Sequence, residues 1–343
     1  MIKVYCDKLI PNKRYLEILN PNFGFRKRKN IFDDKDIFDD FINPIFEIVE
    51  DPDLADFLLI PYNYFFIQDN RQYIRDFIDL SNKFSKKIIV FAIGDSTRYI
   101  DIPNSIILRT SQYLSKKRSN EIIIPAYATD LSYGKEIFYR DKAGIPIIGF
   151  CGWAKTNGIL NKFIFWYKNK FILNGPYRLG LFFRKKSIKI LNKSHLIKTN
   201  FIIRKSYSAN KNTIGLDPIV ARKEYINNIV ESDFILSPKG DGNFSVRFYE
   251  TLSLGRIPIL IDTDCPLPLD KDIDYNRFIL RVSYKDIDNL DKIISDFYSH
   301  ISDDEWIKMQ KTARAMFDQY LRIDVFFRYI FTKENLDKYT SNS

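Results

Sequence analysis

Residues 233–262 read DFILSPKGDGNFSVRFYETLSLGRIPILID, and this stretch decides the fold class. A short apolar run, 234–236, leads into a polar loop with two glycines, and residues 245–254 have the composition of a helix. A second apolar run, 257–261, follows a glycine. The pattern predicts strand, loop, helix and strand, which is the repeating unit of an open α/β sheet. Such sheets bind ligands at the carboxyl ends of their strands, so we expect a binding site at residues 237–243.

The predicted helix carries three polar residues of interest, Ser245, Arg247 and Glu250. Arg247 and Glu250 are three positions apart and therefore share one helix face. A cation in the first turn opposes the helix dipole, so Arg247 is better placed if it meets a bound anion such as a pyrophosphate. Gly240 and Gly242 allow the backbone to approach such a ligand closely. The alternative is a surface Arg–Glu pair on an ordinary βαβ crossover.

The motif Ser-x-Arg-x-x-Glu, with the strands on either side of it, resembles the donor-binding signature of the exostosin-like glycosyltransferases (glycosyltransferase family 47). The bacterial and viral branch of that family is the most similar. Residues 233–268 match most specifically. Other stretches match in the same order along the chain: 55–62, 94–96, 124–125, 147–152 and 201–204.

Apolar runs alternate with helical stretches along the rest of the chain, which predicts two α/β domains. Residues 57–60, 88–91 and 105–108 have the pattern of buried parallel strands. A second series of strands and helices begins at residue 145, and we expect the domain junction near residues 142–144. With 343 residues, the chain is long enough for two full cores.

The resemblance implies the GT-B fold, in which two Rossmann-like domains face a cleft and a C-terminal helix crosses back to the first domain. We therefore expect an N-terminal, acceptor-side domain at residues 1–143 and a donor domain at residues 144–320. Residues 321–343 would form the helix that packs back on the N-terminal domain.

The resemblance also implies the reaction, which is an inverting transfer of sugar from a nucleoside diphosphate sugar. The expected donor is a UDP-sugar, and the expected acceptor is a glycan or glycolipid. Arg247 would contact the phosphates, Glu250 would accept hydrogen bonds from the ribose hydroxyls, and the end of the first strand would lie near the base. The expected donor-binding residues are Gly149, Gly152, Arg204, Ser237, Pro238, Gly240, Gly242, Ser245, Arg247 and Glu250.

Three of these residues have plainer interpretations. Gly149 and Gly152 are placed like the loop that meets the donor in other GT-B enzymes, but two glycines also suit a tight βα turn. Arg204, at the end of a predicted strand, is either a second phosphate contact or a solvated cation.

Charge neutralisation of the diphosphate is expected without a metal cofactor, through arginine and helix N–H groups. The alternative is a metal-dependent enzyme of the GT-A type, which would use the Asp-x-Asp motif of Asp262 and Asp264 directly after a strand. However, the chain repeats this motif at residues 51–53, 272–274 and 286–288.

A general base must take the proton of the acceptor hydroxyl. The two histidines of the chain, His195 and His300, lie far from any motif, so a carboxylate of the first domain is expected to do this. Asp95 is the first candidate and Asp130 the second, each after a predicted strand. Both also suit a turn or cap.

The charge is concentrated in one region. Residues 151–224 contain 16 Lys or Arg and two Asp or Glu, within a chain of net charge +10. An anionic partner is implied, whether the phosphates of a nucleotide sugar, a phospholipid surface, an acidic glycan or nucleic acid. Basic residues alternate with aromatic ones between Lys162 and Lys189, which suits either a membrane-interface segment or a core element with solvated lysines.

Nucleic-acid binding and non-catalytic anion binding are two further functions that a basic region can have. No nucleic-acid-binding motif accompanies the charge, so no nucleic-acid partner is expected. A non-catalytic anion-binding module on a transferase scaffold is the remaining alternative to an enzyme. Three widely spaced cysteines and the lack of a signal peptide or a long apolar run predict a cytoplasmic protein, peripheral at the inner face of the membrane if bound to it.

Overall fold

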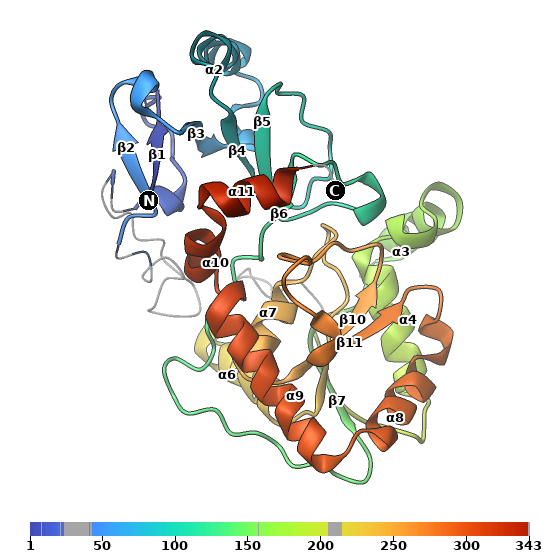
Figure 1. Cartoon of the computed structure of the whole chain (residues 1–343). Helices are drawn as coiled ribbons and strands as arrows, with labels where there is room; N and C mark the ends of the chain where they lie inside the picture. The colour runs from blue at the N-terminus through green and yellow to red at the C-terminus, as the bar shows by residue number, and fades with distance from the viewer. Residues whose placement is uncertain are drawn as a thin grey trace.

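A computed structural model describes residues 1–7, 9–20, 22–23, 41, 43–156, 158–204 and 215–341. Parallel sheets organise these residues into two layered units, one above the other in Figure 1. The strands of the first sheet are β1 (Ile2–Tyr5), β2 (Phe46–Val49), β3 (Phe57–Asn63), β4 (Ile88–Ala92), β5 (Ser105–Arg109) and β6 (Glu121–Ile123). The strands of the second are β7 (Ile147–Trp153), β8 (Lys198–Arg204), β9 (Phe234–Leu236), β10 (Ile257–Asp262) and β11 (Leu280–Ser283).

The strand orders are β2-β1-β3-β4-β5-β6 and β11-β10-β9-β7-β8, and all of the strand pairs are parallel. In each sheet, the strand that comes first in the chain lies inside the sheet, and later strands are added on both sides of it. The direction of winding therefore reverses once in each sheet, between β1 and β3 and between β7 and β9. These two switch points are where connecting loops diverge and leave a crevice at the carboxyl ends of the strands.

Helices cover both sheets. In the first unit, two helices lie between β3 and β4: α1 (Tyr64–Ile67) and α2 (Arg71–Phe84). The helices of the second unit are α3 (Ile159–Tyr167), α4 (Gly180–Leu191), α6 (Pro218–Val230), α7 (Val246–Ser253), α8 (Leu290–His300) and α9 (Asp303–Met316). Asp217 caps α6 and Pro218 occupies its first turn. Ser302 and Glu305 form a capping box at the start of α9. Among the described residues, no helix is both long and apolar enough to cross a bilayer.

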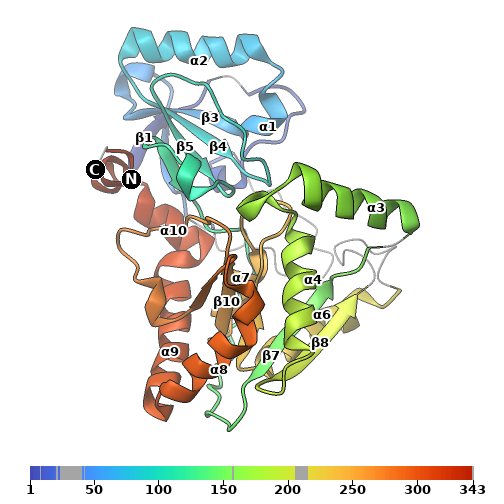
Figure 2. The ribbon, with the colours of Figure 1, turned by 90° about the vertical axis from the view of Figure 1, so that its right-hand side faces the viewer.

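The chain crosses back to the first sheet through α10 (Ile323–Ile330) and α11 (Lys333–Thr340) (Figures 1 and 2). Phe327 of α10 packs 5.8 Å from the ring of Phe91 on β4, and Phe331 packs 4.7 Å from Phe46 on β2. Helix α2 lies on the opposite face of that sheet, where Tyr73 contacts Tyr62. The C-terminal helices thus complete the core of the first unit.

The arrangement is the GT-B type of α/β fold that we expected: two doubly wound sheets and a C-terminal return. The connection between the units is residues 124–146, which lie outside strands and helices. Asp130 in this connection accepts hydrogen bonds from both terminal nitrogens of Arg314 on α9, at 2.8 and 3.0 Å. The expected domain junction at residues 142–144 falls within the same connection.

Candidate active site

A cavity of about 400 Å³ opens where the carboxyl ends of β7 and β9 face the first unit. Cys151, Gly152 and Trp153 line it from β7, and Pro238 lines it just after β9. Asp95, in the loop after β4, closes it from the first unit. The cavity therefore occupies the switch point of the second sheet, the position at which doubly wound sheets bind their ligands.

Arg247 lines this cavity and is held against strand β7. It stands in the first turn of α7, donates from Nη2 to the carbonyl of Cys151 at 2.8 Å, and lies 4.3 Å over the ring of Phe150. A Cβ atom at residue 152 would lie 2.7 Å from Nη2, so Gly152 provides the space for the guanidinium. The Nε atom has no hydrogen-bond partner in the described part of the chain. Because Arg247 also lines the cavity, its guanidinium can meet an anion there.

The N-terminus of α7 adds to this positive environment. Ser245, the residue before the helix, lines the cavity and makes no capping hydrogen bond with its side chain. The first backbone N–H groups of a helix lack partners within the helix and attract negative charge. A phosphate near Arg247 would thus meet the guanidinium and the helix end together.

Glu250 lies one turn further along α7 and is largely buried. Arg222 on α6 donates to its Oε1 at 3.1 Å, and the hydroxyl of Tyr225 donates to its Oε2 at 2.6 Å. These bonds hold the carboxylate in a fixed orientation. Each oxygen retains a second lone pair, so hydroxyl groups of a ligand can still be accepted.

The cavity is richer in cations than in anions. The arginines that line it in the described part of the chain are Arg184, Arg204, Arg222 and Arg247. The acidic residues are Asp95, Asp241 and Glu250. Arg204 lies at the end of β8 and pairs with Glu224 at 2.9 Å, with only 10% of its side chain exposed, so it is not a solvated strand-end cation.

The glycine loop after β9 forms contacts different from those expected. The N–H of Gly240 donates to the carbonyl of Phe244 at 2.8 Å, and the N–H of Gly242 donates to Oδ1 of Asp95 at 3.0 Å. Both groups are therefore engaged within the protein and not open to a phosphate. Ser237 is buried and donates to the carbonyl of Ile235, so Pro238 is the residue of this strand end that lines the cavity.

Gly149 and Gly152 lie within β7 and not in a turn after it. A Cβ atom at residue 149 would lie 2.5 Å from Oγ of Ser232 and 2.7 Å from Cδ1 of Ile235, both buried. Gly149 therefore allows β7 to pack closely against its neighbours and does not line the cavity. Only Gly152 of the pair contributes to the site.

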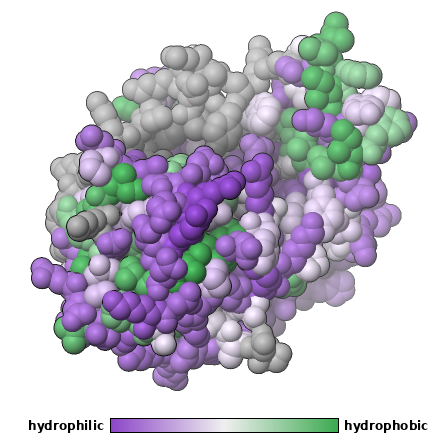
Figure 3. All heavy atoms as spheres, turned by 90° about the horizontal axis from the view of Figure 1, so that it is seen from above, coloured by the Kyte–Doolittle hydropathy of each residue, from purple (hydrophilic) through white to green (hydrophobic). Residues whose placement is uncertain are grey.

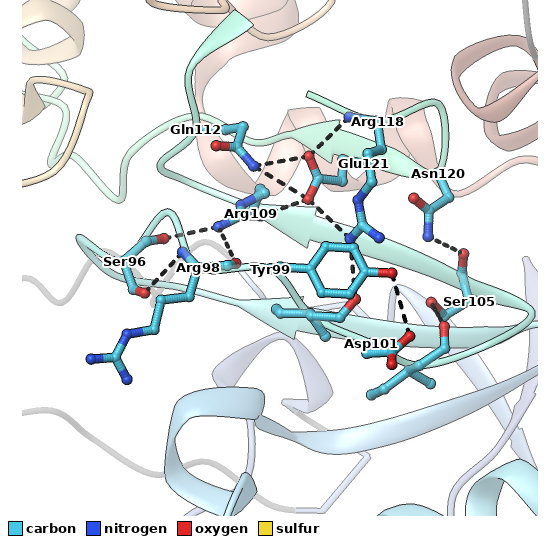
Figure 4. Close-up of polar contacts among 12 residues, drawn as sticks. Ser96, Arg98, Tyr99, Asp101, Ser105, Arg109, Gln112, Arg118, Asn120 and Glu121 are labelled. Atoms are coloured by element: carbon cyan, nitrogen blue, oxygen red, sulfur yellow. Dashed lines mark hydrogen bonds and ion pairs between the residues drawn. The ribbon is translucent and has the colours of Figure 1, made fainter. Parts of the chain in front are cut away.

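Asp95 lies in a loop whose residues on either side of it, Gly94 and Ser96, are hydrogen-bonded to the end of β5. Thr110 bonds the backbone of Gly94 at 2.9 and 2.8 Å. Arg109, fully buried and paired with Glu121 at 2.6 Å, donates to the carbonyl of Ser96 at 2.9 Å (Figure 4). The loop is thereby fixed, and Asp95 projects into the cavity. Burial raises the pKa of Asp95 above its usual value; the hydrogen bond from the N–H of Gly242 opposes this shift, and the nearby charge of Asp241 adds to it.

The remaining carboxylates proposed from the sequence lie elsewhere. Asp130 does not line the cavity. Burial alone would raise the pKa of Asp130, but the hydrogen bonds and the charge of Arg314 lower that pKa below its usual value. Its tight ion pair makes it a structural residue and a poor proton acceptor. Asp262 pairs with Arg281 at 2.9 Å, and Asp264 bonds the backbone of Ser115 at 3.1 Å. No cluster of three or more His, Cys, Asp or Glu suited to a metal ion occurs among the described residues.

Several residues that line the cavity were not predicted from the sequence. Trp153, Arg184, Arg222 and Tyr225 come from a strand end and two helices that the motif does not include. The dense basic charge of residues 151–224 was the available signal for the two arginines, but it did not distinguish them from the other cations of that region.

Part of the second unit is similar to a known protein family. A family model described as the exostosin GT47 domain matches residues 181–297. The Exostosin-1 homolog of Caenorhabditis elegans is 31% identical over 101 residues, 29% of this chain and 25% of that protein. This part of the chain is exostosin-like. The resemblance read from residues 233–268 is confirmed, although the alignment spans only about a quarter of the length of this curated relative.

Two solved structures are also similar. The crystal structure of TarM is 10% identical, with a TM-score of 0.36, over 75% of this chain and 51% of that one. A glycosyltransferase from Rickettsia africae ESF-5 is 14% identical, with a TM-score of 0.40, over 82% and 83% of the two chains.

The exostosin-like stretch includes most of the cavity wall that belongs to the second unit. Arg184, Arg222, Arg247 and Glu250 lie within the matched residues 181–297. Gly152 and Asp95 lie outside them. The site is therefore assembled from the exostosin-like stretch and from residues that precede it in the chain.

Substitution of Gly152 by Ala tests whether the guanidinium of Arg247 binds an anion. The new methyl group would lie 2.7 Å from Nη2, too close for a normal contact, so the flexible arginine would have to move while β7 remains intact. We expect the affinity for inorganic pyrophosphate to fall about tenfold, the value of one charge-assisted hydrogen bond. Titration calorimetry measures the affinity, and a thermal melt should show a loss of stability no larger than the displaced contacts of the guanidinium with β7 contribute.

Two other glycines provide matched controls. Gly144→Ala adds a methyl group with no atom within 4 Å and should change neither property. Gly149→Ala should destabilise the fold by about 1–3 kcal/mol through overpacking. Unchanged pyrophosphate affinity in G152A would contradict the assignment of Arg247 as an anion ligand.

Proposed function

We propose that the chain is an inverting, metal-independent glycosyltransferase that transfers a sugar from a UDP-sugar to a glycan or glycolipid acceptor. The observation that carries this proposal is the position of Arg247. It stands at the start of a helix, at the switch point of an exostosin-like domain, in a cavity closed by the other unit.

The leaving diphosphate would be neutralised by this part of the protein. Departure of UDP from the anomeric carbon places negative charge on the bridging phosphate oxygen. Arg247, with the N-terminus of α7 beside it, supplies hydrogen-bond donors that are already oriented, and such donors stabilise developing charge effectively in a partly enclosed cavity. Arg184 and Arg204 supply additional positive potential from neighbouring walls.

The nucleoside would be positioned by Glu250. Its carboxylate is oriented by Tyr225 and Arg222, and it can accept two hydroxyl groups of the ribose. Pro238 and the end of β9 lie nearby for contact with the base. The selectivity for a ribonucleotide would follow from this fixed acceptor, because a missing hydroxyl leaves a buried carboxylate lone pair unpaired.

The acceptor would be activated by Asp95, on the opposite wall of the cavity. As the acceptor oxygen attacks the anomeric carbon, its proton passes to the carboxylate, the new C–O bond forms, and the bond between sugar and diphosphate breaks. The raised pKa of Asp95 increases its basicity. In the present conformation this carboxylate also joins the two units through Gly242.

We also place this enzyme in the cytoplasm. The described cysteines Cys6, Cys151 and Cys265 are all free thiols, in keeping with a reducing compartment. Burial raises the pKa of Cys265 to about 12, so that thiol is unreactive at neutral pH.

Turnover of a UDP-sugar panel in the presence of EDTA tests the proposed reaction. We expect one or more donors to release UDP, and Arg247→Ala to lower kcat about 10²- to 10³-fold because a charge-stabilising donor is lost. Arg75→Ala, an exposed arginine on α2, is the matched control and should leave turnover unchanged. Full activity in R247A, or no UDP release from any donor, would contradict the proposal.

The role of Asp95 predicts a pH dependence. A base acts in its deprotonated form, so kcat/KM should fall as the pH drops through the raised pKa of this carboxyl. Asp95→Asn keeps the hydrogen bond to Gly242 but cannot take a proton, so kcat should fall about 10²- to 10⁴-fold while UDP affinity is retained. The residual activity should lack the acidic limb of the wild-type profile. Wild-type turnover in D95N would exclude Asp95 as the base.

A further inference from the structure

Helix α3 and the π-helical turn that follows it, η4 (Lys168–Ile172), leave a row of large apolar side chains uncovered. No residue of α3 is buried. Figure 3 shows an apolar projection at this side of the molecule, in its upper right part. We call these residues the α3 ridge: Ile159, Leu160, Phe163, Ile164, Trp166, Tyr167, Phe171 and Ile172, which are between 40% and 88% exposed.

The α3 ridge reverses the usual arrangement of a surface helix, which turns its apolar face toward the core. Ridge residues recur at helical spacing, as in Leu160, Phe163, Tyr167 and Phe171, and form one broad face. The opposite face makes the contacts with the protein. There Asn169 is buried and accepts from the N–H of Leu179 at 3.1 Å. A contiguous exposed apolar face of this kind marks an interaction surface.

The chemistry of the ridge points to a bilayer interface. Trp166 and Tyr167 are residues that favour the headgroup region of membranes. Lys162 and Lys168 flank the ridge, and Lys170 lies 5.0 Å over the ring of Trp166. Lysines in such positions can extend to lipid phosphates while their stems lie along apolar surface.

The positive charge around the ridge favours a bilayer of anionic lipid as its partner. The sequence from Lys142 to Leu216 contains no Asp or Glu at all, although it contains many lysines and arginines. A second copy of the same basic region would be repelled, whereas an anionic surface would attract it. The aromatic residues between Lys162 and Lys189 were expected to form either a membrane interface or a core element. Phe183 on α4 is buried in the core, whereas the aromatic residues of the α3 ridge are exposed, so the core interpretation does not hold for the ridge.

We propose that the α3 ridge inserts into the headgroup region of an anionic lipid bilayer and holds the protein at the membrane surface. Helix α3 follows β7 after a short connection, and Trp153 at the end of β7 lines the cavity. Docking would therefore place the mouth of the cavity near the bilayer. If the proposed function is correct, a lipid-linked acceptor could reach the site from that surface.

Vesicle flotation of the full chain tests this proposal. Wild-type protein should float with vesicles that contain phosphatidylglycerol and much less with pure phosphatidylcholine, and high salt should weaken the binding. The double substitution F163S/W166S should lower the partition coefficient about tenfold or more, because two inserted rings are lost. The tryptophan emission of the wild type should shift to the blue when vesicles are added, and this shift should be absent in F163S/W166S, which lacks Trp166.

A matched control replaces two exposed phenylalanines elsewhere, in F66S/F138S, where the side chains are 62% and 77% exposed. This variant should partition like the wild type. Equal flotation of F163S/W166S and wild type would overturn the proposal, as would the absence of flotation with both lipid mixtures. Self-association abolished by F163S/W166S, without vesicle binding, would instead assign the ridge to contact between copies. UDP binding should be unchanged in F163S/W166S, which separates this test from that of the proposed function.

Discussion

The contact between Arg247 and strand β7 is the interaction on which the site depends. The guanidinium donates to the carbonyl of Cys151, lies on the ring of Phe150 and occupies the space left by Gly152. A hydrogen bond from a charged donor contributes about 1.5–3 kcal/mol, and a cation over an aromatic ring about 0.5–2 kcal/mol. These contacts keep a positive charge at the switch point of the sheet. In turn, that charge is what makes the crevice suitable for a diphosphate.

The cavity exists because the two units meet along the loop after β9. Lys239 donates to the hydroxyl of Tyr113 at 3.1 Å, and Gly242 and Asn243 donate to side chains of the first unit at 3.0 and 2.9 Å. Burial lowers the pKa of Lys239 to about 8. The loop side of the motif thus joins the units, while the helix side would contact the proposed ligand. This explains why its glycine N–H groups are engaged within the protein.

The sequence predicted the elements well and the site in part, for physical reasons. The strands expected at residues 57–60, 88–91 and 105–108 are present as β3, β4 and β5, because short apolar runs bounded by turn residues are a local signal. Arg247 and Glu250 share a helix face by spacing alone. By contrast, the partnership of Gly152 with Arg247 requires that β7 and β9 be neighbours, which no local pattern shows. The outward face of α3 was equally hidden, because helical spacing gives a face but not its direction.

Calorimetric titration of the wild-type chain with UDP, GDP, CMP and ADP, each first with EDTA and then with manganese, tests the central claim most directly. The claim is that arginine and a helix end bind the diphosphate of a uridine nucleotide without a metal. It predicts that UDP binds in EDTA and that manganese adds little. Binding only with manganese would contradict the metal-free site and direct attention to Asp262 and Asp264. If no nucleotide gives a heat of binding, the result would contradict the donor site itself and favour a non-catalytic anion-binding module.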